Sequence, residues 1–397
     1  MTDAILVLNI GSSSIKFAVY PADAEAEPLA KGGIDAIGRA PVLTARTASG
    51  AVTDEPAPGG RAAGHAELTQ WLLGQLTRFL GAARPVAVGH RVVHGGPDFA
   101  APVVIDPGVL ERLAALTPLA PGHQPHNLAG VRAVAAIWPD LPQVACFDTA
   151  FHRAQPRIAQ LFALPRRLTD QGVLRYGFHG LSYEHIASVL PRDAGARAEG
   201  RVIVAHLGHG ASMCAMRERR SVATTMGFTA LDGLVMGKRC GELDPGVVLH
   251  LLRDEGMSVG EVDALLSHES GLLGVSGISD DMRDLLASDD PHAAEAVELF
   301  VYRAVRWIGS LTAALGGLDA LVFTGGIGEH APEIRARIVE GAAWLGARLD
   351  GDANRAGETR IDRPDSAVGL FVIPTDEERV IARATRALTG GADVHAA

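Results

Sequence analysis

Three glycine-containing turns follow short apolar stretches and have the size to hold a phosphate. They are Gly11 to Ser14, Gly208 to Gly210 and Gly325 to Gly328. Glycine lets backbone N–H groups approach a phosphate closely, and serine hydroxyls add donors with little bulk. One such turn is usually no more than a turn, but three in equivalent positions favour nucleotide binding. Lys16, two residues beyond the first turn, could add a compact positive charge.

Charged side chains stand at the ends of other apolar stretches. Arg91 lies within Gly89 to Gly96, and its planar guanidinium suits a carboxylate or phosphate as well as a structural ion pair. Asp148 directly follows the apolar run 144–147, at the kind of position where ligands of open α/β sheets gather. It could serve metal or acid–base chemistry, or only cap a helix. His179 has aromatic and glycine neighbours, where a core histidine is the plainer interpretation.

Charged residues in three later segments are further candidates for the site. Lys238 and Arg239 place two cations in a glycine-bounded loop. Asp281 and Arg283 could contact a nucleotide, or the segment could simply begin a helix. Glu377 is an acid in what should be the first turn of a helix, where it would complement the helix dipole.

Familiar metal-binding and nucleotide-binding patterns do not account for these residues. His90 and His94 have the spacing of zinc ligands on a helix, but the valines and glycines around them argue against a helix. The stretch 233–238 ends in Gly-Lys without the glycine spacing of a P-loop. The stretch 326–331 fits the dinucleotide form G-x-G-x-x-A, with Asp350 about 20 residues on. A dehydrogenase gives the other two glycine turns no role, so it stays a minor alternative.

The elements that must position these groups alternate in type, which predicts an α/β fold. Expected strands cover 5–8, 15–20, 86–88, 144–147, 202–206, 212–216, 321–323 and 370–373. Helices are expected over 68–79 and from Pro291 to Gly316. A last helix opens with Thr375 to Glu378, which spells a capping box. The stretch 47–64 is rich in Ala, Gly and Pro and predicts a surface loop.

One pattern occurs twice in the chain. Residues 5–20 read as strand, Gly/Ser turn and strand, and residues 202–216 read the same way. Hairpins with glycine turns are common, but this repetition suggests a duplicated domain, each copy opening on a phosphate-sized turn.

The composition bounds the class of protein. The 397 residues suggest two or three domains, and 47% hydrophobic with 21% charged residues is typical of a globular chain. A net charge of −10 argues against sequence-independent binding to nucleic acid or to anionic lipid. Cys146, Cys214 and Cys240 form no CxxC pair, so we expect no disulfide framework or structural zinc, as fits a reducing cytoplasm. We also expect neither a signal peptide nor a membrane span.

Together these segments resemble the acetate kinase family, within the actin, hexokinase and Hsp70 superfold. The family's blocks occur in order from N-I-G-S-S-S-I-K-F to P-T-D-E-E, and between them stand G-H-R-V-V-H-G-G, F-D-T-A-F-H, Y-G-F-H-G, H-L-G-x-G, G-E-L-D-P-G, S-D-D-M-R and G-G-I-G-E. The resemblance implies duplicated ribonuclease-H-like domains, residues 1–147 plus 377–397 and residues 148–376. It also implies an active site in the interdomain cleft, domain closure over the substrate, and a homodimer.

The activity implied is reversible transfer of the γ-phosphoryl group of ATP to acetate or another short-chain carboxylate, with Mg²⁺ or Mn²⁺. Asn9 and Glu377 match the family's metal positions, and Arg91 matches the residue that holds the carboxylate. Asp148 matches the catalytic acid, and His179 and Arg239 match transition-state stabilisers. Nucleotide-binding positions are matched by Lys16, His206, Leu207, Gly208, His209, Gly210, Asp281, Met282, Arg283, Gly325, Gly326, Ile327, Gly328 and Glu329.

The chemistry of the acceptor limits the role of the catalytic acid. A carboxylate acceptor is already ionised at pH 7, so Asp148 need not remove a proton from it. Phosphoryl transfer depends mainly on positioning and on cations around the transferred group. Orienting magnesium or its water is therefore the expected role of Asp148.

The acyl group has its own predicted pocket. By the resemblance, Val93, Gly122, Phe178 and Ala230 line it, with Gly122 standing where the family usually has Leu and Ala230 where it has Pro. Both changes remove volume, which predicts that propionate is used nearly as well as acetate and leaves room for butyrate. Neighbours such as Leu119 could instead refill the space.

Other positions depart from the family pattern as well. His209 stands where Asn is usual, Lys238 where Thr is usual, and Cys240 and Glu242 where Ser and Asp are usual. The competing interpretations are a kinase for a longer acid, such as propionate or butyrate, and a non-catalytic nucleotide-binding module. The module explains the sequence less well, because a simple binder needs none of the arginine, histidine and aspartate residues assigned to catalysis.

Overall fold

The computed structural model describes residues 2–11, 14–23, 25–38 and 40–390. The chain divides into two compact units, residues 1–150 with 376–397 (unit 1) and residues 151–375 (unit 2). The sequence-based prediction places the domain boundaries after residue 147 and before residue 377. Ser12 and Ser13 of the first glycine turn lie outside the described residues.

Unit 1 is built on an eight-stranded sheet of order β5-β4-β3-β2-β1-β6-β8-β7 in its described part. Strands β1 to β5 are antiparallel neighbours, whereas β1, β6 and β8 run parallel. The strands are β1 (Asp3–Ile10), β2 (Ile15–Pro21), β3 (Ala30–Asp35), β4 (Val42–Thr47), β5 (Val52–Pro56), β6 (Arg84–Val92), β7 (Val103–Val104) and β8 (Gln143–Phe147).

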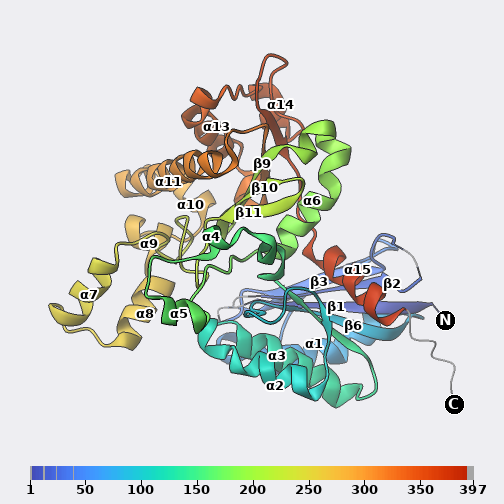
Figure 1. Ribbon diagram of the computed structural model, residues 1–397. Helices are drawn as coiled ribbons and strands as arrows, with labels where there is room; N and C mark the ends of the chain where they lie inside the picture. The colour runs from blue at the N-terminus through green and yellow to red at the C-terminus, as the bar shows by residue number, and fades with distance from the viewer. Residues whose placement is uncertain (1, 12–13, 24, 39, 391–397) are drawn as a thin grey trace. The chain divides into compact units, whose positions relative to one another are not determined.

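Helices cover both faces of this sheet. In Figure 1, α1 (His65–Leu80) and α3 (Gln124–Ile137) lie on one face and α15 (Glu377–Thr389) lies on the other. Apolar side chains of α1 such as Leu68, Leu72 and Leu76 are fully buried against β1, β2 and β3. The remaining helical segments of unit 1 are η1 (Gly60–Ala62), α2 (Pro107–Ala115) and η2 (Thr117–Leu119), while η3 (Ala150–Ala154) spans the division between the units.

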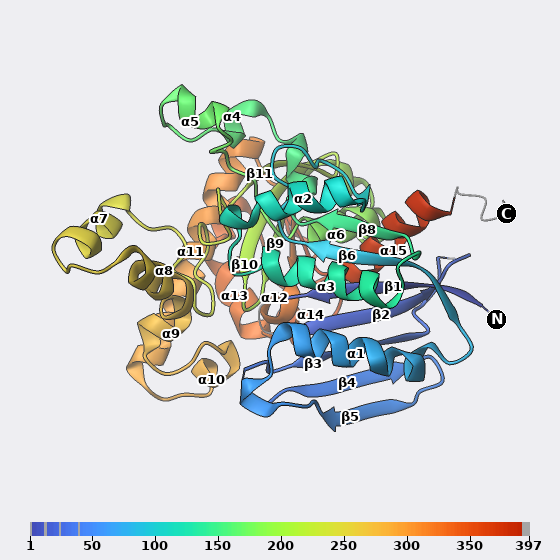
Figure 2. The same ribbon diagram turned by 90° about the horizontal axis from the view of Figure 1, so that it is seen from below.

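The prediction of a surface loop over 47–64 was wrong in its first half. Residues 52–56 form β5, which pairs with β4 and is the outermost strand at this side of the sheet, as Figure 2 shows. The burial of β5 alternates between exposed and half-buried residues, so no apolar run marks it in the sequence. Its pairing is set by the neighbouring strand rather than by its own composition.

Unit 2 contains a five-stranded sheet of order β11-β10-β9-β12-β13 in its described part. Strands β9, β10 and β11 are antiparallel, and β9, β12 and β13 run parallel. The strands are β9 (Arg201–Leu207), β10 (Ala211–Arg217), β11 (Arg220–Thr224), β12 (Ala320–Thr324) and β13 (Gly369–Val372).

Figure 1 shows α11 (Pro291–Leu315) and α6 (Gly180–Ala194) on opposite faces of this second sheet. α11 is the long helix expected from the sequence, and it ends at Gly316 in the left-handed conformation. The other helical segments are α4 (Arg157–Gln160), α5 (Arg166–Asp170), η4 (Gly195–Glu199), α7 (Pro245–Arg253), α8 (Val259–His268), α9 (Gly271–Ser276), α10 (Met282–Leu286), α12 (Gly325–His330), α13 (Pro332–Gly341), η5 (Ala343–Leu345) and α14 (Gly351–Ala356). None of the helices in the described ranges is long and apolar enough to cross a membrane.

The two units repeat one strand order. The run β3-β2-β1-β6-β8 of unit 1 corresponds to β11-β10-β9-β12-β13 of unit 2, with three antiparallel strands followed by two parallel ones in each. In each sheet the first two strands along the chain form the hairpin that the sequence repetition marked, β1–β2 and β9–β10. The α/β fold with duplicated ribonuclease-H-like domains is therefore confirmed.

Candidate active site

In unit 1 the predicted site residues gather at one edge of the sheet. Asn9 is the penultimate residue of β1, Arg91 is near the end of β6, and Asp148 directly follows β8. These three strands are parallel, so their carboxyl ends share this edge. Asn9 and Asp148 are buried and Arg91 is half-buried.

Arg91 and Asp148 form a two-pronged ion pair. Arg91 Nε donates to Asp148 Oδ1 at 2.9 Å, and Arg91 Nη2 donates to Oδ2 at 2.6 Å. Arg91 Nη1 donates to Asn9 Oδ1 at 3.2 Å. Burial would lower the pKa of Arg91, but the charge of Asp148 outweighs it and raises that pKa. The guanidinium is therefore cationic at every working pH and is already shared between two protein groups.

Two carboxylates at the start of α15 complete this edge. Asn9 Nδ2 donates to Glu377 Oε2 at 3.2 Å and to Glu378 Oε1 at 3.1 Å. Desolvation is the largest cause that raises the pKa of each glutamate, and the neighbouring acids Asp148 and Glu377 respectively add to it. The three carboxylates Asp148, Glu377 and Glu378 thus outnumber the two cations near them, Arg91 and Lys16.

The sequence did not single out Glu378 as a site residue. It was assigned to a capping box, but the N-cap of α15 is Asp376, whose side chain accepts from Arg379 N at 3.1 Å. The capping-box prediction was wrong because the helix begins one residue later than the spelling implies. Glu378 therefore takes no part in the cap, and its side chain accepts a hydrogen bond from Asn9.

The donor set at this edge fits a hard divalent cation. Carboxylate and amide oxygens are the ligands that Mg²⁺ prefers, and Mg²⁺ is commonly held by one or two carboxylates plus substrate phosphates and water. Glu377 and Glu378 supply the carboxylates, and Asn9 supplies an amide. Among the described residues no group of three or more His, Cys, Asp and Glu side chains is arranged to hold a metal ion.

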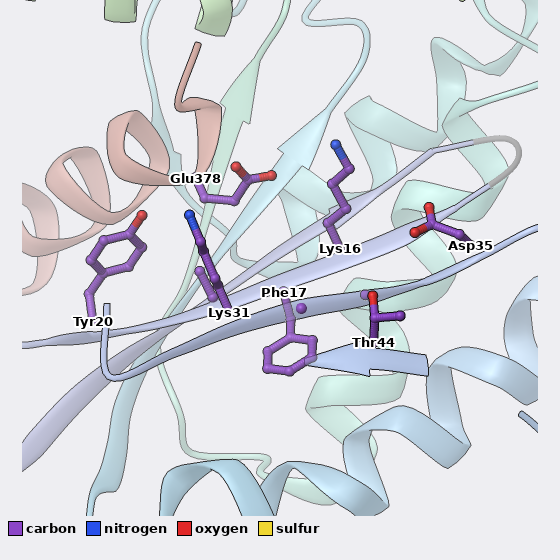
Figure 3. Close-up of a pocket in the computed structure, with 10 residues that line it drawn as sticks. Lys16, Phe17, Tyr20, Lys31, Asp35, Thr44 and Glu378 are labelled. Carbon is purple, nitrogen blue, oxygen red and sulfur yellow. The ribbon is translucent and has the colours of Figure 1, made fainter. Parts of the chain in front are cut away.

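Lys16 and Glu378 also line a pocket of about 290 Å³ on the face of the unit 1 sheet. Figure 3 shows Lys16, Tyr20 and Lys31 projecting to the same side as Glu378, whereas Phe17 points to the opposite side. Asn9 and Lys16 are direct partners in the β1–β2 ladder. Asn9 and Lys16 therefore lie on one hairpin, and the two glutamates lie on the neighbouring helix α15.

In unit 2, His179 is held in an uncommon backbone conformation. It caps α6 with φ 57° and ψ 24°, a left-handed geometry that is rare outside glycine. The carbonyl of Phe178 accepts from Nε2 of the buried His152 at 2.9 Å, and Ser221 Oγ contacts His152 Nδ1 at 2.9 Å. Gly177 also has a positive φ, and a Cβ there would meet the His152 ring at 2.6 Å. The ring of His152 therefore holds the backbone of residues 177–178 in place.

His179, Gly210 and Arg239 converge in unit 2. A Cβ built on Gly210 would lie 2.6 Å from Arg239 Nη2 and 3.3 Å from His179 Nε2. Arg239 Nη1 donates to the carbonyl of Ala230 at 2.6 Å, which orients the guanidinium. His179 also stacks on His206, with ring centroids 4.3 Å apart. Both predicted stabilisers therefore stand beside the second glycine turn.

The second and third glycine turns lie next to each other. A Cβ on Gly208 would lie 3.7 Å from Gly326 N, and one on Gly325 would lie 2.9 Å from the carbonyl of Leu207. Glu329 ties the third turn together, since its Oε1 accepts from Gly325 N at 2.9 Å and from Thr375 N at 3.2 Å. Ile327 and Gly328 belong to the same short helix, α12.

Three further predicted nucleotide-binding residues lie at the start of α10. Asp281 is the N-cap of α10, and its carboxylate pairs with the exposed Arg283, while Met282 is buried. His209 Nε2 lies 2.9 Å from Asp280 Oδ2, and Lys238 Nζ lies 3.5 Å from the same oxygen. Two of the departures from the family pattern therefore meet at one carboxylate.

The predicted acyl-pocket residues are divided between the units. Val93 is buried in unit 1, where its N–H donates to Asn127 Oδ1 at 2.9 Å. Gly122 lies in an exposed turn of unit 1, and a Cβ there would meet open space. Phe178 is buried and Ala230 is half-buried in unit 2.

Several motifs that the sequence offered as alternatives have structural roles. His90 lies in β6, where Nε2 contacts Gln143 Oε1 at 2.7 Å and burial lowers its pKa to about 4. His94 Nδ1 accepts from Gly96 N at 2.8 Å. Asp350, the acid expected of a dinucleotide site, is the N-cap of α14. Neither a zinc pair nor a dinucleotide fingerprint is needed to explain them.

Comparison with known proteins gives a single family. The model of the acetokinase family matches residues 4–383. The chain belongs to this family. It is accordingly a phosphotransferase with a carboxyl group as acceptor.

Similar proteins and solved structures match nearly the whole length of the chain. Acetate kinase from Rhodopseudomonas palustris is 59% identical over 98% of this chain and 100% of its own, and that of Rhizobium meliloti is 53% identical over 97% and 98%. The crystal structure of Porphyromonas gingivalis acetate kinase matches with a TM-score of 0.85 at 34% identity over 97% and 99%. A propionate kinase from Francisella tularensis matches with a TM-score of 0.89 at 37% identity over 97% and 99%.

Proposed function

We propose that this enzyme catalyses the acetate kinase reaction, in which the γ-phosphoryl group of ATP passes reversibly to acetate. An acetate oxygen forms a bond to the γ-phosphorus while the bond to the β,γ-bridging oxygen breaks, which gives acetyl phosphate and ADP. The observation that carries the proposal is the convergence of His179 and Arg239 on the glycine at position 210. An N–H donor and a guanidinium beside a bare backbone suit the oxygens of a phosphoryl group.

Unit 1 supplies the groups for the acceptor and the metal. Arg91 holds the acetate carboxylate, sharing its guanidinium with Asp148. Asn9 and Glu377, with Glu378 beside them, hold Mg²⁺, for which Mn²⁺ can substitute. When bound, the cation neutralises phosphate charge. The raised pKa values of the two glutamates support this role, because a cation would relieve the same desolvation and repulsion.

Asp148 acts by orientation in this proposal. Its carboxylate fixes the Arg91 guanidinium through contacts of 2.6 and 2.9 Å, and orients the metal or its water. It has no proton to remove, because acetate is a carboxylate at neutral pH. The ion pair with Arg91 supports this role, since both carboxylate oxygens of Asp148 already accept hydrogen bonds from the guanidinium.

Unit 2 supplies the groups for the nucleotide and the transition state. The turns at Gly208 and Gly325 hold phosphates through backbone N–H groups, and Asp281 to Arg283 contact the nucleoside. His179 and Arg239 stabilise the charge on the transferred phosphoryl group, for which a low-dielectric, preorganised setting is most effective.

We further propose that acetate is the main acceptor, that the enzyme works in the cytoplasm and that it is a homodimer. The curated relatives named above are acetate kinases, which supports acetate over a longer acid. All three cysteines are free thiols, as suits a reducing compartment. Light scattering on the purified protein tests the oligomeric state.

A coupled assay tests the reaction. The purified enzyme is given ATP, Mg²⁺ and in turn acetate, propionate or butyrate, and acyl phosphate is trapped as the hydroxamate. We expect metal-dependent hydroxamate formation with acetate and a stoichiometric release of ADP. Release of ADP without hydroxamate from any of the acids would contradict the proposal.

A further inference from the structure

The stacked histidines of unit 2 each make a hydrogen bond from Nδ1 to a serine. His179 Nδ1 lies 2.8 Å from Ser212 Oγ, and His206 Nδ1 lies 2.8 Å from Ser182 Oγ. Each serine also contacts a second hydroxyl, Tyr183 for Ser212 and Thr375 for Ser182. Each ring therefore lies at the end of its own hydrogen-bonded chain of two hydroxyl groups, Tyr183–Ser212 for His179 and Thr375–Ser182 for His206.

The order of donors in the first chain follows from the burial of Tyr183. The Tyr183 hydroxyl lies 2.5 Å from Ser212 Oγ, and among the described residues this is its single hydrogen bond. Tyr183 and Ser212 are both fully buried. A serine hydroxyl carries one proton, so it can donate either to the histidine or to the tyrosine.

The two possibilities differ in cost. If Ser212 donates to Tyr183, the tyrosine proton is left in the interior without an acceptor, which is unfavourable. If Tyr183 donates to Ser212, then Ser212 donates to His179 Nδ1 and both hydroxyl protons are used. In that arrangement the Nδ1 atom is an acceptor, so the proton of a neutral His179 is on Nε2.

The second chain gives the same result for His206. Thr375 Oγ1 donates to Ser182 Oγ at 2.8 Å, which leaves the Ser182 proton for His206 Nδ1. The two Nε2 atoms both face the second glycine turn. Nε2 of His179 is 3.3 Å from the Cβ position of Gly210, and Nε2 of His206 is 4.0 Å from that of Gly208.

We propose that Tyr183, through Ser212, is a positioning residue that fixes neutral His179 with its proton on Nε2, aimed at the glycine turn. Together with His206 and the guanidinium of Arg239, this makes a set of donors for phosphoryl oxygens. With the opposite tautomer a lone pair would face those oxygens and repel them. The inference rests on the proposed function only for the use of His179 in phosphoryl transfer, since the tautomer itself is a property of the folded chain.

The test reads the tautomer directly. The full-length enzyme is labelled with ¹⁵N-histidine, and the ring signals of His179 are identified by their loss in His179→Gln. In the neutral ring we expect Nε2 to carry the proton and Nδ1 to have the shift of an unprotonated nitrogen. In Tyr183→Phe and Ser212→Ala the fixed order of donors is lost, so we expect a mixture of the two tautomers.

A matched variant controls for the loss of a buried phenol. Tyr176 is also buried, but its hydroxyl donates to the carbonyl of Gly172 at 2.8 Å, so Tyr176→Phe should leave the His179 signals unchanged. In the kinase assay Tyr183→Phe should lower kcat by about three- to tenfold, the worth of one hydrogen bond, with the KM for acetate near that of the wild type. Thermal melting establishes that each variant is folded.

The outcomes separate the inference from the proposed function. A wild-type His179 protonated on Nδ1, or a pure Nε2 tautomer that persists in both variants, overturns the inference whatever the activity. A tautomer change in Tyr183→Phe without any change in kcat leaves the inference standing and argues against the catalytic use of His179. Absence of kinase activity in the wild type overturns the proposed function alone.

Discussion

The first hairpins of the two sheets, β1–β2 and β9–β10, have the same topology but lie beside different kinds of polar groups. The β1–β2 hairpin of unit 1 meets charged side chains, Arg91, Asp148 and two glutamates. The β9–β10 hairpin of unit 2 meets neutral hydroxyls, stacked imidazoles and bare glycines, with Arg239 beside them. One fold thus offers two kinds of electrostatic surroundings at equivalent positions.

We interpret this difference as a division of labour, in which each unit binds one of the two proposed substrates. Binding a small carboxylate and a metal requires protein groups of both charges held close together. The carboxylates of the protein are destabilised by burial and repulsion until a cation binds between them. Polyphosphate oxygens can be held by many N–H groups and a few cations, for which glycine turns and imidazole donors suffice. If this interpretation is right, substitutions in the two units should have distinguishable effects.

The largest effects are expected from the two arginines. Arg239→Ala and Arg91→Ala should each lower kcat/KM by about 10²–10³, as when one stabilising donor is removed from a developing anion. Arg91→Ala should also destabilise the protein, because Asp148 is left as a buried, unpaired carboxylate. Steady-state kinetics and thermal melting measure both.

Two surface arginines serve as matched controls for these changes. Arg84 lies in the same strand as Arg91 but pairs with Asp3 at the surface, and Arg219 pairs with Glu199. Alanine at either position should leave turnover within about twofold, because exposed ion pairs contribute little. Near-normal activity in a folded Arg91→Ala or Arg239→Ala variant would remove that residue from the proposed site.

A smaller effect is expected at Asp148, and it distinguishes two roles. If the carboxylate orients Arg91 and the metal, Asp148→Asn should lower kcat by about ten- to hundredfold, and raised Mg²⁺ should restore part of the loss. The pH profile of the remaining activity should barely move. A general base would instead give the wild type an acidic limb that disappears in the variant, and finding that limb would refute the orienting role.

The next prediction concerns the width of the acyl pocket. If Gly122 leaves space there, the ratio of kcat/KM for propionate over acetate should be near one in the wild type. Gly122→Leu should lower the ratio by about tenfold, since one methylene in an apolar pocket is worth roughly 1–3 kcal/mol in discrimination. A Cβ at this exposed turn meets open space, so the variant should fold normally. A wild type that strongly rejects propionate, or a ratio unchanged by Gly122→Leu, would show that the space is filled by neighbours.

The smallest effect tests the excess of negative charge in unit 1. Desolvation raises the pKa of Glu378 in the folded chain, so its ionised form destabilises the fold at neutral pH. This destabilisation should fade as the pH falls through the raised pKa. Glu378→Gln should therefore raise the metal-free Tm at pH 7 by about 2–4 °C or less, and scanning calorimetry should show the difference shrinking toward pH 4.

The same variant should respond less to metal. Mg²⁺ should raise the Tm of the wild type in the presence of ADP, and it should raise that of Glu378→Gln by less. Asp284, an exposed acid in α10 of unit 2, provides the control, since Asp284→Asn should leave both the Tm and its metal dependence unchanged. A Glu378→Gln protein that melts below the wild type at pH 7 without metal would contradict the assignment of this glutamate to a crowded cation site.

The local sequence was enough to predict eight of the strands and three of the helices. The strands around Ile5 and Val202 were evident from apolar, β-rich runs, and the long helix was bounded by Pro291 and Gly316, because these features depend on near neighbours along the chain. The repeated hairpin predicted the duplication, which the strand orders of the two sheets confirm. The family, too, followed from short blocks of residues in order, and the family comparison confirms it.

Tertiary structure alone decided which polar groups meet. β5 has no apolar run and exists because β4 offers an unpaired edge. Glu378 looked like part of a helix cap, and it contacts Asn9 only because α15 packs beside the carboxyl end of β1. The chain Tyr183–Ser212–His179 joins residues from a helix, a strand and a cap. Contacts of this kind depend on distances across the fold, whereas a sequence pattern reports only the neighbours within a few residues.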